Sequence, residues 1–580
     1  MENIMTILAD SNAKLAANEE ITFNNLNKLY NYQLKCEKNE IYYLIETFWN
    51  EYNSKLGIDI RDSLYEVGTG VVEVYFEDVS DTVTGKKAYE YVAGEDVNFK
   101  LELRQKETNI LFPCSSFSYT YRIDGVVDED NNTVDYTGTQ SGESGIFTLT
   151  IPASEINKSP LLQKGKGVVI ELLVEAFSTE DTIICEGGAT LKGYAGGAAV
   201  NFKDIKATQE KPSDYEVFWA EQIERVKNTD PTDATVPTEK TRYSAIGEHP
   251  DILLYDDIDL TNYFHIKKFD KALLSSYREK GLSSAEDSCL DLFDIYEIYL
   301  KAPGPNPATG ILSIPKNKTS LDARFGFAGY GVSAPSISLN DSVISFHATH
   351  HGYPCGLSRD EYYTELYAKV LNSYGTAVGR PNSTYKNKDD CYILYMFLRN
   401  LQAVRFIDEC KSKDIRALDT DSALYDLYAN LKRAFSGSIT LWGGSMGGYQ
   451  TLGISALSAM AGYNVVMTHS LVSAFCNNSG YTKEGRINNI FGVYYEDNMD
   501  YFDGVFFAEY IKSEIAFSQV AFGDYTCPPS GIIAAYNAVK SKKTMNLYQN
   551  SQHDYWPTRV INGIEKHTNP VYTFKSESKI

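Results

Sequence analysis

Apolar side chains recur at helical spacing in the first part of this 580-residue chain. Leu26, Leu29 and Leu34 follow this spacing, and a second apolar cluster around Trp49 continues it up to about residue 54. Such a pattern predicts helices that pack on a neighbouring domain or subunit. We therefore expect an N-terminal helical segment over residues 1–62.

The pattern changes after that segment, because residues 63–204 contain short runs in which apolar and polar positions alternate, such as FKLEL and FSYTYRI. Turn-rich segments separate the runs, as in a β-sandwich, and we predict an accessory domain of that type. One turn, GVVDEDNNT, resembles the start of a calcium loop at Asp128. Thr133 and Thr139 stand where such a loop needs glycine and glutamate, so the segment is interpreted as a hairpin turn.

Strand and helix patterns alternate over the remaining residues, 205–580. Strands are predicted at 293–301, 308–314, 323–327, 342–347, 438–442, 463–467, 516–522 and 544–548. Helices are predicted at about 360–373, 391–410, 446–461 and 528–541. This alternation predicts an α/β fold, with a doubly wound, mostly parallel sheet covered by helices on both faces.

Composition and charge narrow the classes of function. The proportions of 43% hydrophobic and 23% charged residues are those of an ordinary globular protein. No apolar run is long enough to cross a bilayer, and the first residues do not resemble a signal peptide, so we expect a cytoplasmic protein. Nine cysteines without CxxC pairs favour reduced thiols over disulfides or a zinc site. The net charge of −23 argues against nucleic acid or an anionic membrane as a partner.

One segment carries a candidate nucleophile. In SITLWGGSMGGYQTLGISALSAM an apolar run is followed by a tight turn with the pattern GxSxG and then by a helical pattern rich in small residues. A nucleophile elbow of the α/β-hydrolase type needs glycines on both sides of its serine, because strand and helix approach each other closely there. Gly443, Gly447 and Gly448 meet that need, so Ser445 is the predicted nucleophile.

A serine nucleophile needs a histidine base, and the base needs an acid that orients it. In this fold the acid follows the serine in the chain and the histidine comes last. His553 follows the predicted strand TMNLYQ and Asp524 follows the run IAFSQVAFG, so both stand at strand ends. We predict His553 as base and Asp524 as acid. The residues set aside for these roles are His469, His567, Asp497, Asp500 and Asp503.

Three stretches, GGSMGGYQT, GDYTCPPSGIIAAYNAV and LYQNSQHDYW, resemble the acetyl xylan esterase and cephalosporin-C deacetylase family of α/β-hydrolases. The segments KPSDYEVFWAE and DLFDIYEIYLKAPGPNPATGILSIPK are similar to earlier parts of that family, so the resemblance extends over residues 205–580. Carried over residue by residue, the family's triad corresponds to Ser445, Asp524 and His553. The resemblance implies a serine esterase that removes acetyl or other short acyl groups from acetylated carbohydrates or similar small esters through an acyl-enzyme.

The resemblance also implies an oxyanion hole, which binds the negative oxygen of the reaction intermediate. The family's first donor is the amide of a tyrosine in an HGY motif, and RFGFAGYGVS gives Tyr330, with Ala328 in place of histidine. A second candidate, Tyr353 in HATHHGYPCG, falls where the family has an Arg-Gly-Gln motif. We choose Tyr330 as one donor and Met446, which follows the nucleophile, as the other.

Two other functions remain open. The segment GGSMGGYQT also resembles serine peptidases of the prolyl oligopeptidase family, although about 200 preceding residues cannot hold their usual β-propeller. A catalytically silent carbohydrate-binding protein is the other alternative. We expect no cofactor and no metal, a small-molecule or oligosaccharide ester as the partner, no nucleic acid and no membrane, and we leave a homo-oligomer open. Bulky residues near the elbow, Trp442, Met446, Tyr449 and Tyr330, suggest a short acyl slot.

Overall fold

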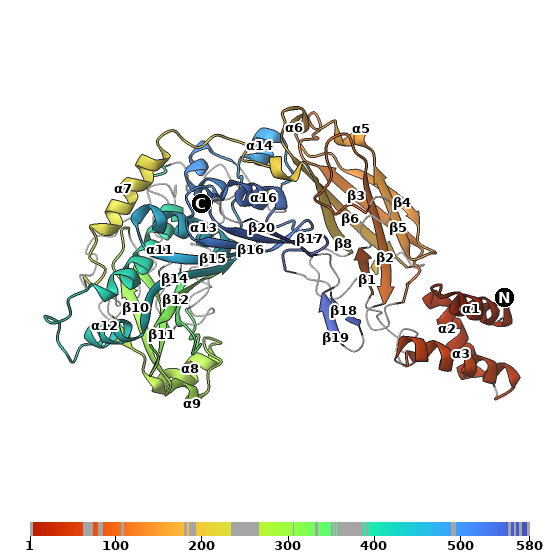
Figure 1. Cartoon of the computed structure of the whole chain (residues 1–580), viewed down its shortest axis with the longest axis horizontal. Helices are drawn as coiled ribbons and strands as arrows, with labels where there is room; N and C mark the ends of the chain where they lie inside the picture. Colours follow the sequence, from red (N-terminus) through yellow and green to blue (C-terminus); the bar gives the residue numbers. More distant parts are fainter. Residues whose placement is uncertain are drawn as a thin grey trace.

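A computed structural model of the chain describes most of its residues (Figure 1). The described residues are 4–36, 38–57, 59–61, 74–78, 85–105, 110–178, 183–184, 193–233, 266–304, 307–330, 335–349, 352, 355–356, 387–389, 392–488, 495–554, 558–561, 564–567 and 571–576. They form a group of N-terminal helices, two antiparallel sheets and one large mixed sheet with its helices. Figure 1 shows the N-terminal helices and the large sheet at opposite ends of the molecule.

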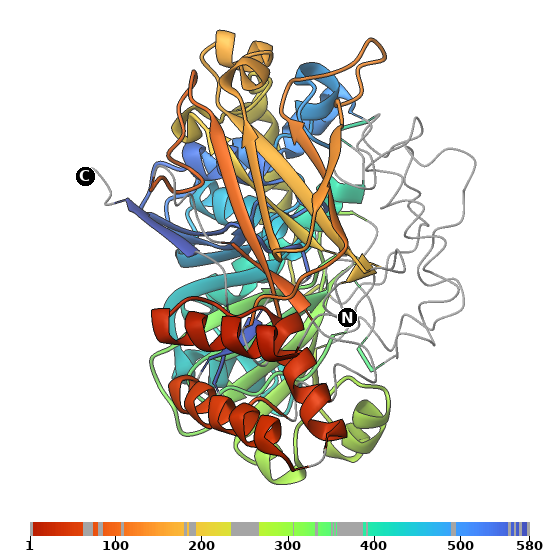
Figure 2. The same ribbon diagram turned by 90° about the vertical axis from the view of Figure 1, so that its right-hand side faces the viewer.

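The N-terminal segment consists of three helices, α1 (Ile4–Ala17), α2 (Phe23–Lys35) and α3 (Glu40–Leu56). Thr22 and Asn39 cap the starts of α2 and α3 with their side chains, and Gly57 ends α3 in the left-handed conformation. The helices share a small apolar core that includes Leu26 and Trp49. Figure 2 shows the three helices together, below the accessory strands.

The accessory region contains two antiparallel sheets. Its strands are β1 (Val74–Asp78), β2 (Val97–Gln105), β3 (Ser116–Ile123), β4 (Tyr136–Ser141), β5 (Ile146–Ile151), β6 (Val168–Phe177), β7 (Ile183–Ile184) and β8 (Tyr194–Val200). One sheet has the order β1-β2-β5; the other has the order β4-β3-β6-β7, with β8 also paired to β6. The ring of Phe147 on β5 lies 5.9 Å from that of Phe117 on β3, so the two sheets contact each other. Two short helices, α5 (Ala153–Ile156) and α6 (Pro160–Gln163), follow β5.

The acidic turn at Asp128 forms local hydrogen bonds. The Asp128 carboxylate accepts hydrogen bonds from the backbone N–H groups of Asp130 and Asn132. Val127 and Thr133 pair across the turn as an antiparallel bridge. The segment has the geometry of the hairpin turn predicted from the sequence.

The large sheet has the order β20-β17-β16-β15-β14-β12-β13-β11-β10-β9. Its strands are β9 (Lys267–Lys268), β10 (Phe293–Leu300), β11 (Ala308–Pro315), β12 (Leu321–Phe327), β13 (Ile344–Thr349), β14 (Phe435–Gly444), β15 (Val465–Leu471), β16 (Glu514–Ala521), β17 (Lys543–Tyr548) and β20 (Val571–Ser576). Neighbouring strands from β13 to β17 are parallel, and the pairs at the two ends of the sheet are antiparallel. A separate hairpin joins β18 (Thr558–Ile561) to β19 (Ile564–His567). The carboxyl ends of the parallel strands therefore lie at one edge of the sheet.

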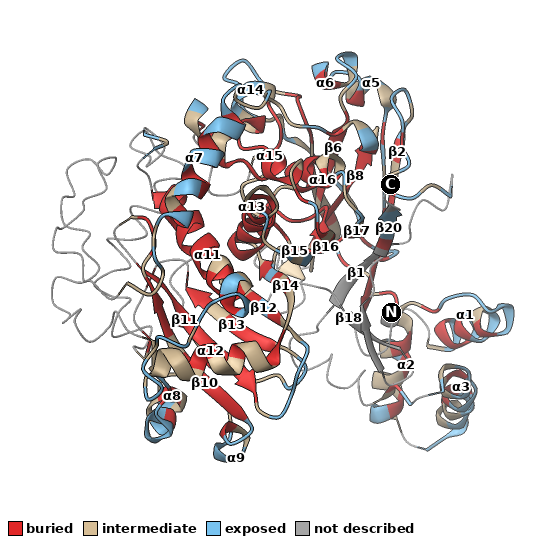
Figure 3. Cartoon of the chain, turned by 60° about the vertical axis from the view of Figure 1, so that its left-hand side comes forward, coloured by how far each residue is buried: buried red, intermediate tan, exposed pale blue. Residues whose placement is uncertain are grey.

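Helices connect these strands. They are α7 (Tyr215–Lys227), α8 (Leu274–Glu279), α9 (Asp287–Leu290), α11 (Tyr392–Asp408), α12 (Ala423–Ala434), α13 (Met446–Ala461), α14 (Gly480–Glu484), α15 (Gly504–Ala508) and α16 (Pro529–Ala538). Helices α11 and α13 are buried along most of their length (Figure 3). No helix among the described residues is both long and apolar enough to span a membrane.

The two faces of the large sheet are covered differently. Tyr296 and Ile298 of β10 belong to the main core with the long helices, whereas Ile295 on the other face packs in a smaller core with residues of α8 and α9. Helices thus cover both faces at β10. At β14 and β15, in contrast, Trp442 is 47% exposed and Val466 38% exposed.

The strands predicted from the apolar pattern correspond closely to β10–β17, and three predicted helices correspond to α11, α13 and α16. The α/β class is therefore confirmed. The helix predicted at 360–373 lies outside the described residues. The proposed domain limits, after residues 62 and 204, stay a prediction.

Candidate active site

The predicted nucleophile stands in a strained turn between β14 and α13. Ser445 has φ 56° and ψ −118°, a backbone conformation that residues other than glycine rarely adopt. Its N–H donates a hydrogen bond to Leu471 O at 2.9 Å, and its carbonyl accepts hydrogen bonds from the N–H groups of Tyr449 and Ala474. The surrounding backbone holds the turn in the form of a nucleophile elbow.

Glycines around Ser445 make this turn sterically feasible. A Cβ atom on Gly443 would lie 2.4 Å from Gly447 O, and one on Gly447 would lie 2.3 Å from Phe327 O. A Cβ atom on Gly448 would lie 2.5 Å from Leu471 O. Each of these contacts is with backbone that cannot move aside easily, so strand and helix approach as closely as the motif predicted.

The structure places the predicted acid and base side by side. Asp524 follows β16 and His553 follows β17, and His553 Nδ1 lies 3.1 Å and 3.0 Å from the two carboxylate oxygens of Asp524. Asp524 Oδ1 also accepts hydrogen bonds from the N–H groups of Thr526, at 2.9 Å, and Cys527, at 2.7 Å. Asp524 is 1% exposed, and these hydrogen bonds fix its carboxylate beside the imidazole.

The charge of Asp524 changes the titration of its neighbour. Burial disfavours the imidazolium form of His553, but the hydrogen bond and the negative charge of Asp524 outweigh burial and raise the pKa of His553 above its usual value of 6.5. An Nδ1–H donor toward Asp524 leaves Nε2 as the proton acceptor of the neutral ring. The arrangement can therefore supply a base of the kind that a serine nucleophile needs.

A thiol that the sequence analysis did not single out joins this group. Cys527 is 3% exposed, and burial, followed by the charge of Asp524, raises the pKa of its thiol well above the usual range. A hydrogen bond between the side chains of Cys527 and Ser445 acts in the opposite direction. Cys527 thus interacts with both Ser445 and Asp524. The DYTCPPS motif contained the signal, because it places this cysteine three residues after Asp524.

The same cluster has donor atoms of metal-binding type. Each of Asp524, Cys527 and His553 offers one possible ligand atom, and these three atoms lie within 4.8 Å of one another. This is the one such group among the residues that the structure describes. Asp524 and His553 already bond to each other, and the raised pKa of Cys527 keeps its thiol protonated. These donors therefore fit an acid, a base and a neighbouring thiol better than a metal site.

A comparison with family models matches residues 481–569 to the family described as acetyl xylan esterase (AXE1). The predicted resemblance to that family is confirmed. The matched segment contains Asp524, Cys527 and His553, and the predicted enzyme class, a carboxylic-ester hydrolase, is confirmed with it.

Solved structures similar to the chain include two acetyl xylan esterases. The enzymes from Paenibacillus and Thermoanaerobacterium are each 16% identical to it, with a TM-score of 0.37; 61% of this chain aligns with 93% and 92% of theirs, respectively. An acylaminoacyl peptidase from Pyrococcus horikoshii is 12% identical, with a TM-score of 0.28 over 45% of this chain and 38% of that chain. No curated protein matches the chain.

The predicted oxyanion donors lie on the two segments that meet at the elbow. Met446 begins α13 directly after Ser445 and is buried, and Tyr330 follows β12 and is 51% exposed. Gln450 Nε2 donates to Ala328 O at 3.1 Å, which ties the segment before Tyr330 to α13. Tyr353, the alternative donor, lies outside the described residues.

The residues set aside during sequence analysis have other surroundings. Asp503 caps α15, and its carboxylate accepts hydrogen bonds from three backbone N–H groups. Tyr495 donates a hydrogen bond to Asp500, and Asp497 begins a short 3-10 helix. His469 lies within β15 rather than after it, and the tail that includes His567 forms strands. His567 has no described side chain.

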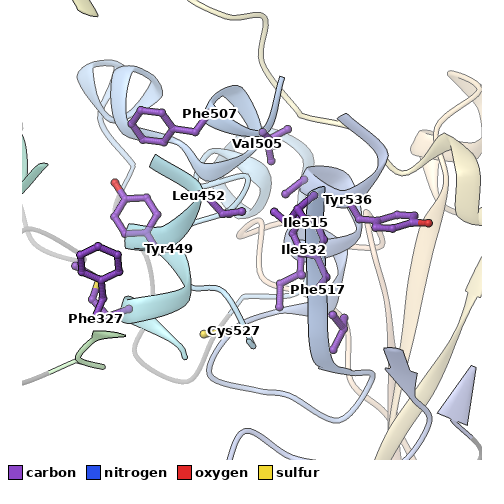
Figure 4. Close-up of a cluster of buried hydrophobic side chains, with 14 of the residues drawn as sticks. Phe327, Tyr449, Leu452, Val505, Phe507, Ile515, Phe517, Cys527, Ile532 and Tyr536 are labelled. Carbon is purple, nitrogen blue, oxygen red and sulfur yellow. The ribbon is translucent and has the colours of Figure 1, made fainter. Parts of the chain in front are cut away.

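One of the bulky residues expected to limit the acyl slot, Tyr449, lies in the core instead. Tyr449 is fully buried against Phe397 and donates a hydrogen bond to Phe502 O at 2.6 Å. Figure 4 shows Tyr449 among the core side chains of α13 and α15. Trp442 lies one residue before Gly443 and is exposed. Closeness to Ser445 in the chain does not show which way a side chain points, so the sequence argument could not assign either residue to the site.

Proposed function

We propose that this chain is a serine esterase that removes acetyl and other short acyl groups from acetylated carbohydrates or similar small esters. The observation that supports the proposal most is the Asp524–His553 hydrogen bond at the carboxyl edge of the sheet that also carries the Ser445 elbow. The match to the acetyl xylan esterase family over the same segment supports the acetyl group and the carbohydrate. The proposed partner is a small-molecule or oligosaccharide ester.

In the proposed reaction, Ser445 Oγ attacks the carbonyl carbon of the ester while His553 Nε2 accepts the serine proton. The negative charge that forms on the carbonyl oxygen is stabilised by the N–H groups of Met446 and Tyr330. Collapse of this intermediate breaks the ester bond, and His553 returns the proton to the departing alcohol. Asp524 keeps the ring in the required tautomer and stabilises its charged form.

The second half of the reaction uses the same groups. His553 accepts a proton from water as the water oxygen attacks the acyl-enzyme, and the Met446 and Tyr330 amides again hold the oxyanion. Release of the acid returns the proton to Ser445. Cys527, which is buried, lies beside both Ser445 and Asp524.

A substrate panel tests this proposal. We expect kcat/KM to be largest for p-nitrophenyl acetate, severalfold lower for butyrate and lowest for octanoate, since each poorly fitting methylene shifts selectivity by about 1–3 kcal/mol. An alanyl anilide should react more slowly than the acetate. A maximum at octanoate would contradict a short-acyl esterase, and a maximum at the anilide would favour the peptidase alternative.

A further inference from the structure

Strand β8 of the accessory region lies directly against the two loops that carry the catalytic acid and base. Figure 1 shows β8 next to β17, the strand that precedes His553. We infer that β8 and the buried Asp124–Arg486 ion pair are positioning elements of the active site, which hold the Asp524 and His553 loops in register. The inference rests on the proposed function and names a role for the accessory region in that same site.

The acid loop contacts β8 at Gly523. A Cβ atom on this residue would lie 1.9 Å from Ala195 O of β8 and 2.7 Å from Ser551 O of the base loop. Gly523 immediately precedes Asp524, so the backbone of the acid is held between the accessory strand and the backbone that leads to His553. A side chain at this position cannot be accommodated without moving one of these segments.

The base loop contacts β8 one residue further along. A Cβ atom on Gly196 would lie 2.5 Å from Gln549 O and 2.4 Å from the hydroxyl of Tyr194. Gln549 lies between the end of β17 and His553. Gly196 and its neighbour Ala195 thus contact one catalytic loop each, and the close approach of Gln549 O explains why position 196 is a glycine.

A buried ion pair also joins the accessory region to the segment that follows α14. Arg486 Nη1 lies 3.0 Å from Asp124 Oδ2, and both side chains are at most 2% exposed. Asp124 follows β3 of the accessory region, and its other oxygen accepts a hydrogen bond from Ile487 N at 2.9 Å. Gly125 N donates to Gly485 O at 2.9 Å. Removing one partner of such a pair leaves a buried charge and is costly, so a substitution at Asp124 is expected to loosen this contact.

A small cavity links the ion pair to the acid. Asp124 and Glu171 of the accessory region line this cavity together with Asp524 and Ser530. The cavity has a volume of about 10 Å³. That volume accommodates one water at most. Residues of the accessory region therefore share this cavity with the proposed catalytic acid.

These contacts have a consequence for the base. The pKa of His553 is raised by Asp524, so a displacement of the acid loop lowers that pKa and weakens the base. A displacement of about 1 Å at reacting groups costs on the order of a hundredfold in rate. A change at Gly196, where β8 contacts the base loop, should thus alter the chemistry at Ser445, although no residue of β8 belongs to the triad.

The test uses the full-length chain and three variants. Gly196→Ala places a methyl group against the base loop, whereas the control Gly197→Ala places one 2.0 Å from Ile170 O, inside the accessory sheet and away from the catalytic loops. Asp124→Asn removes the negative charge of the ion pair and keeps a side chain of the same size. This variant remains informative if Gly196→Ala does not fold. Thermal unfolding is measured for each variant.

The readout is the rate at which a fluorophosphonate labels Ser445 between pH 5 and 9, because this rate does not depend on the identity of the ester substrate. We expect Gly196→Ala to label about tenfold to a hundredfold more slowly, with a lower pH midpoint, and Asp124→Asn to change in the same direction by less. Gly197→Ala should lose thermal stability but keep the wild-type midpoint.

Wild-type midpoints and rates in folded Gly196→Ala and Asp124→Asn would overturn the inference, and so would equal changes in Gly196→Ala and Gly197→Ala. If the wild-type protein is labelled at Ser445 but hydrolyses no ester, the proposed function fails while the positioning role stands. A wild-type protein that is not labelled would contradict both.

Discussion

His553 and Asp524 were predictable at the level of single residues because each follows an apolar run at a strand end. The structure brings them within 3.0 Å, although 29 positions separate them in the chain. Cys527 was not predicted as a site residue, since a lone buried cysteine has no spacing signal of its own. Its contact with Ser445 depends on how the acid loop folds back under the elbow.

The Asp524–His553 pair predicts how activity depends on pH. In the proposed mechanism the neutral imidazole is the active base, and Asp524 raises the pKa of His553, so kcat/KM should rise with pH through a midpoint above 6.5. Asp524→Asn should lower this midpoint and reduce kcat about 10⁴-fold through the wrong tautomer. Initial rates on p-nitrophenyl acetate from pH 5 to 9 measure both effects. A flat wild-type profile, or a stronger loss in Asp503→Asn than in Asp524→Asn, would show that these roles are misassigned.

Asp500 predicts a second pH effect, on stability. Burial raises the pKa of Asp500 to about 7, whereas in the unfolded chain a carboxyl titrates near 3.9. The protonated form is therefore favoured in the folded state, and its stabilising contribution is lost as pH rises through about 7. The Asp500→Asn substitution keeps the shape of the side chain but removes its ability to ionise. At pH 8.5 the free energy of unfolding of this variant should therefore be about 1–2 kcal/mol higher than that of the wild type. Denaturant unfolding at pH 5 and pH 8.5 checks this, and an equal difference at both pH values would contradict it.

At the level of elements, the apolar pattern predicted the central strands well because buried parallel strands are nearly continuous apolar runs. No element was predicted after residue 548, yet the C-terminal tail contains β18, β19 and β20, and β20 pairs with β17 at the edge of the large sheet. Tyr572 on β20 donates a hydrogen bond to Gln549 in the base loop at 2.8 Å. The tail was missed because an edge strand is defined by its partner, and the local pattern VYTFKS is short and mixed.

The elbow predicts a sharp difference between neighbouring glycines. A methyl group on Gly447 would lie 2.3 Å from Phe327 O, so Gly447→Ala should push α13 away from β12, destabilise the fold by about 1–3 kcal/mol and reduce kcat strongly. Gly444, in the same turn, has only a side-chain contact at 3.8 Å, and Gly444→Ala is the matched control. Thermal unfolding and initial rates compare the two variants. Equal effects of the two substitutions would contradict the close strand–helix approach.

At the scale of the whole molecule, the sequence divided the chain into helical, accessory and catalytic parts, but it could not predict how these parts contact one another. The contact of Gly196 with Gln549 and the buried Asp124–Arg486 pair each join positions more than 300 residues apart. No periodicity records such a contact, because close backbone approach depends on the final packing of both regions. The sequence left the role of the accessory region open, and the contacts of β8 point to the proposed active site.

The central claim is that Ser445 performs the chemistry, and Ser445→Ala tests it most directly. Turnover of p-nitrophenyl acetate is measured for both proteins at a pH above the His553 midpoint, with circular dichroism as the control for folding. The account predicts an unchanged fold and a loss of about 10⁴ to 10⁶ in kcat, because the triad acts as a unit. Residual activity within about tenfold of wild type would contradict it.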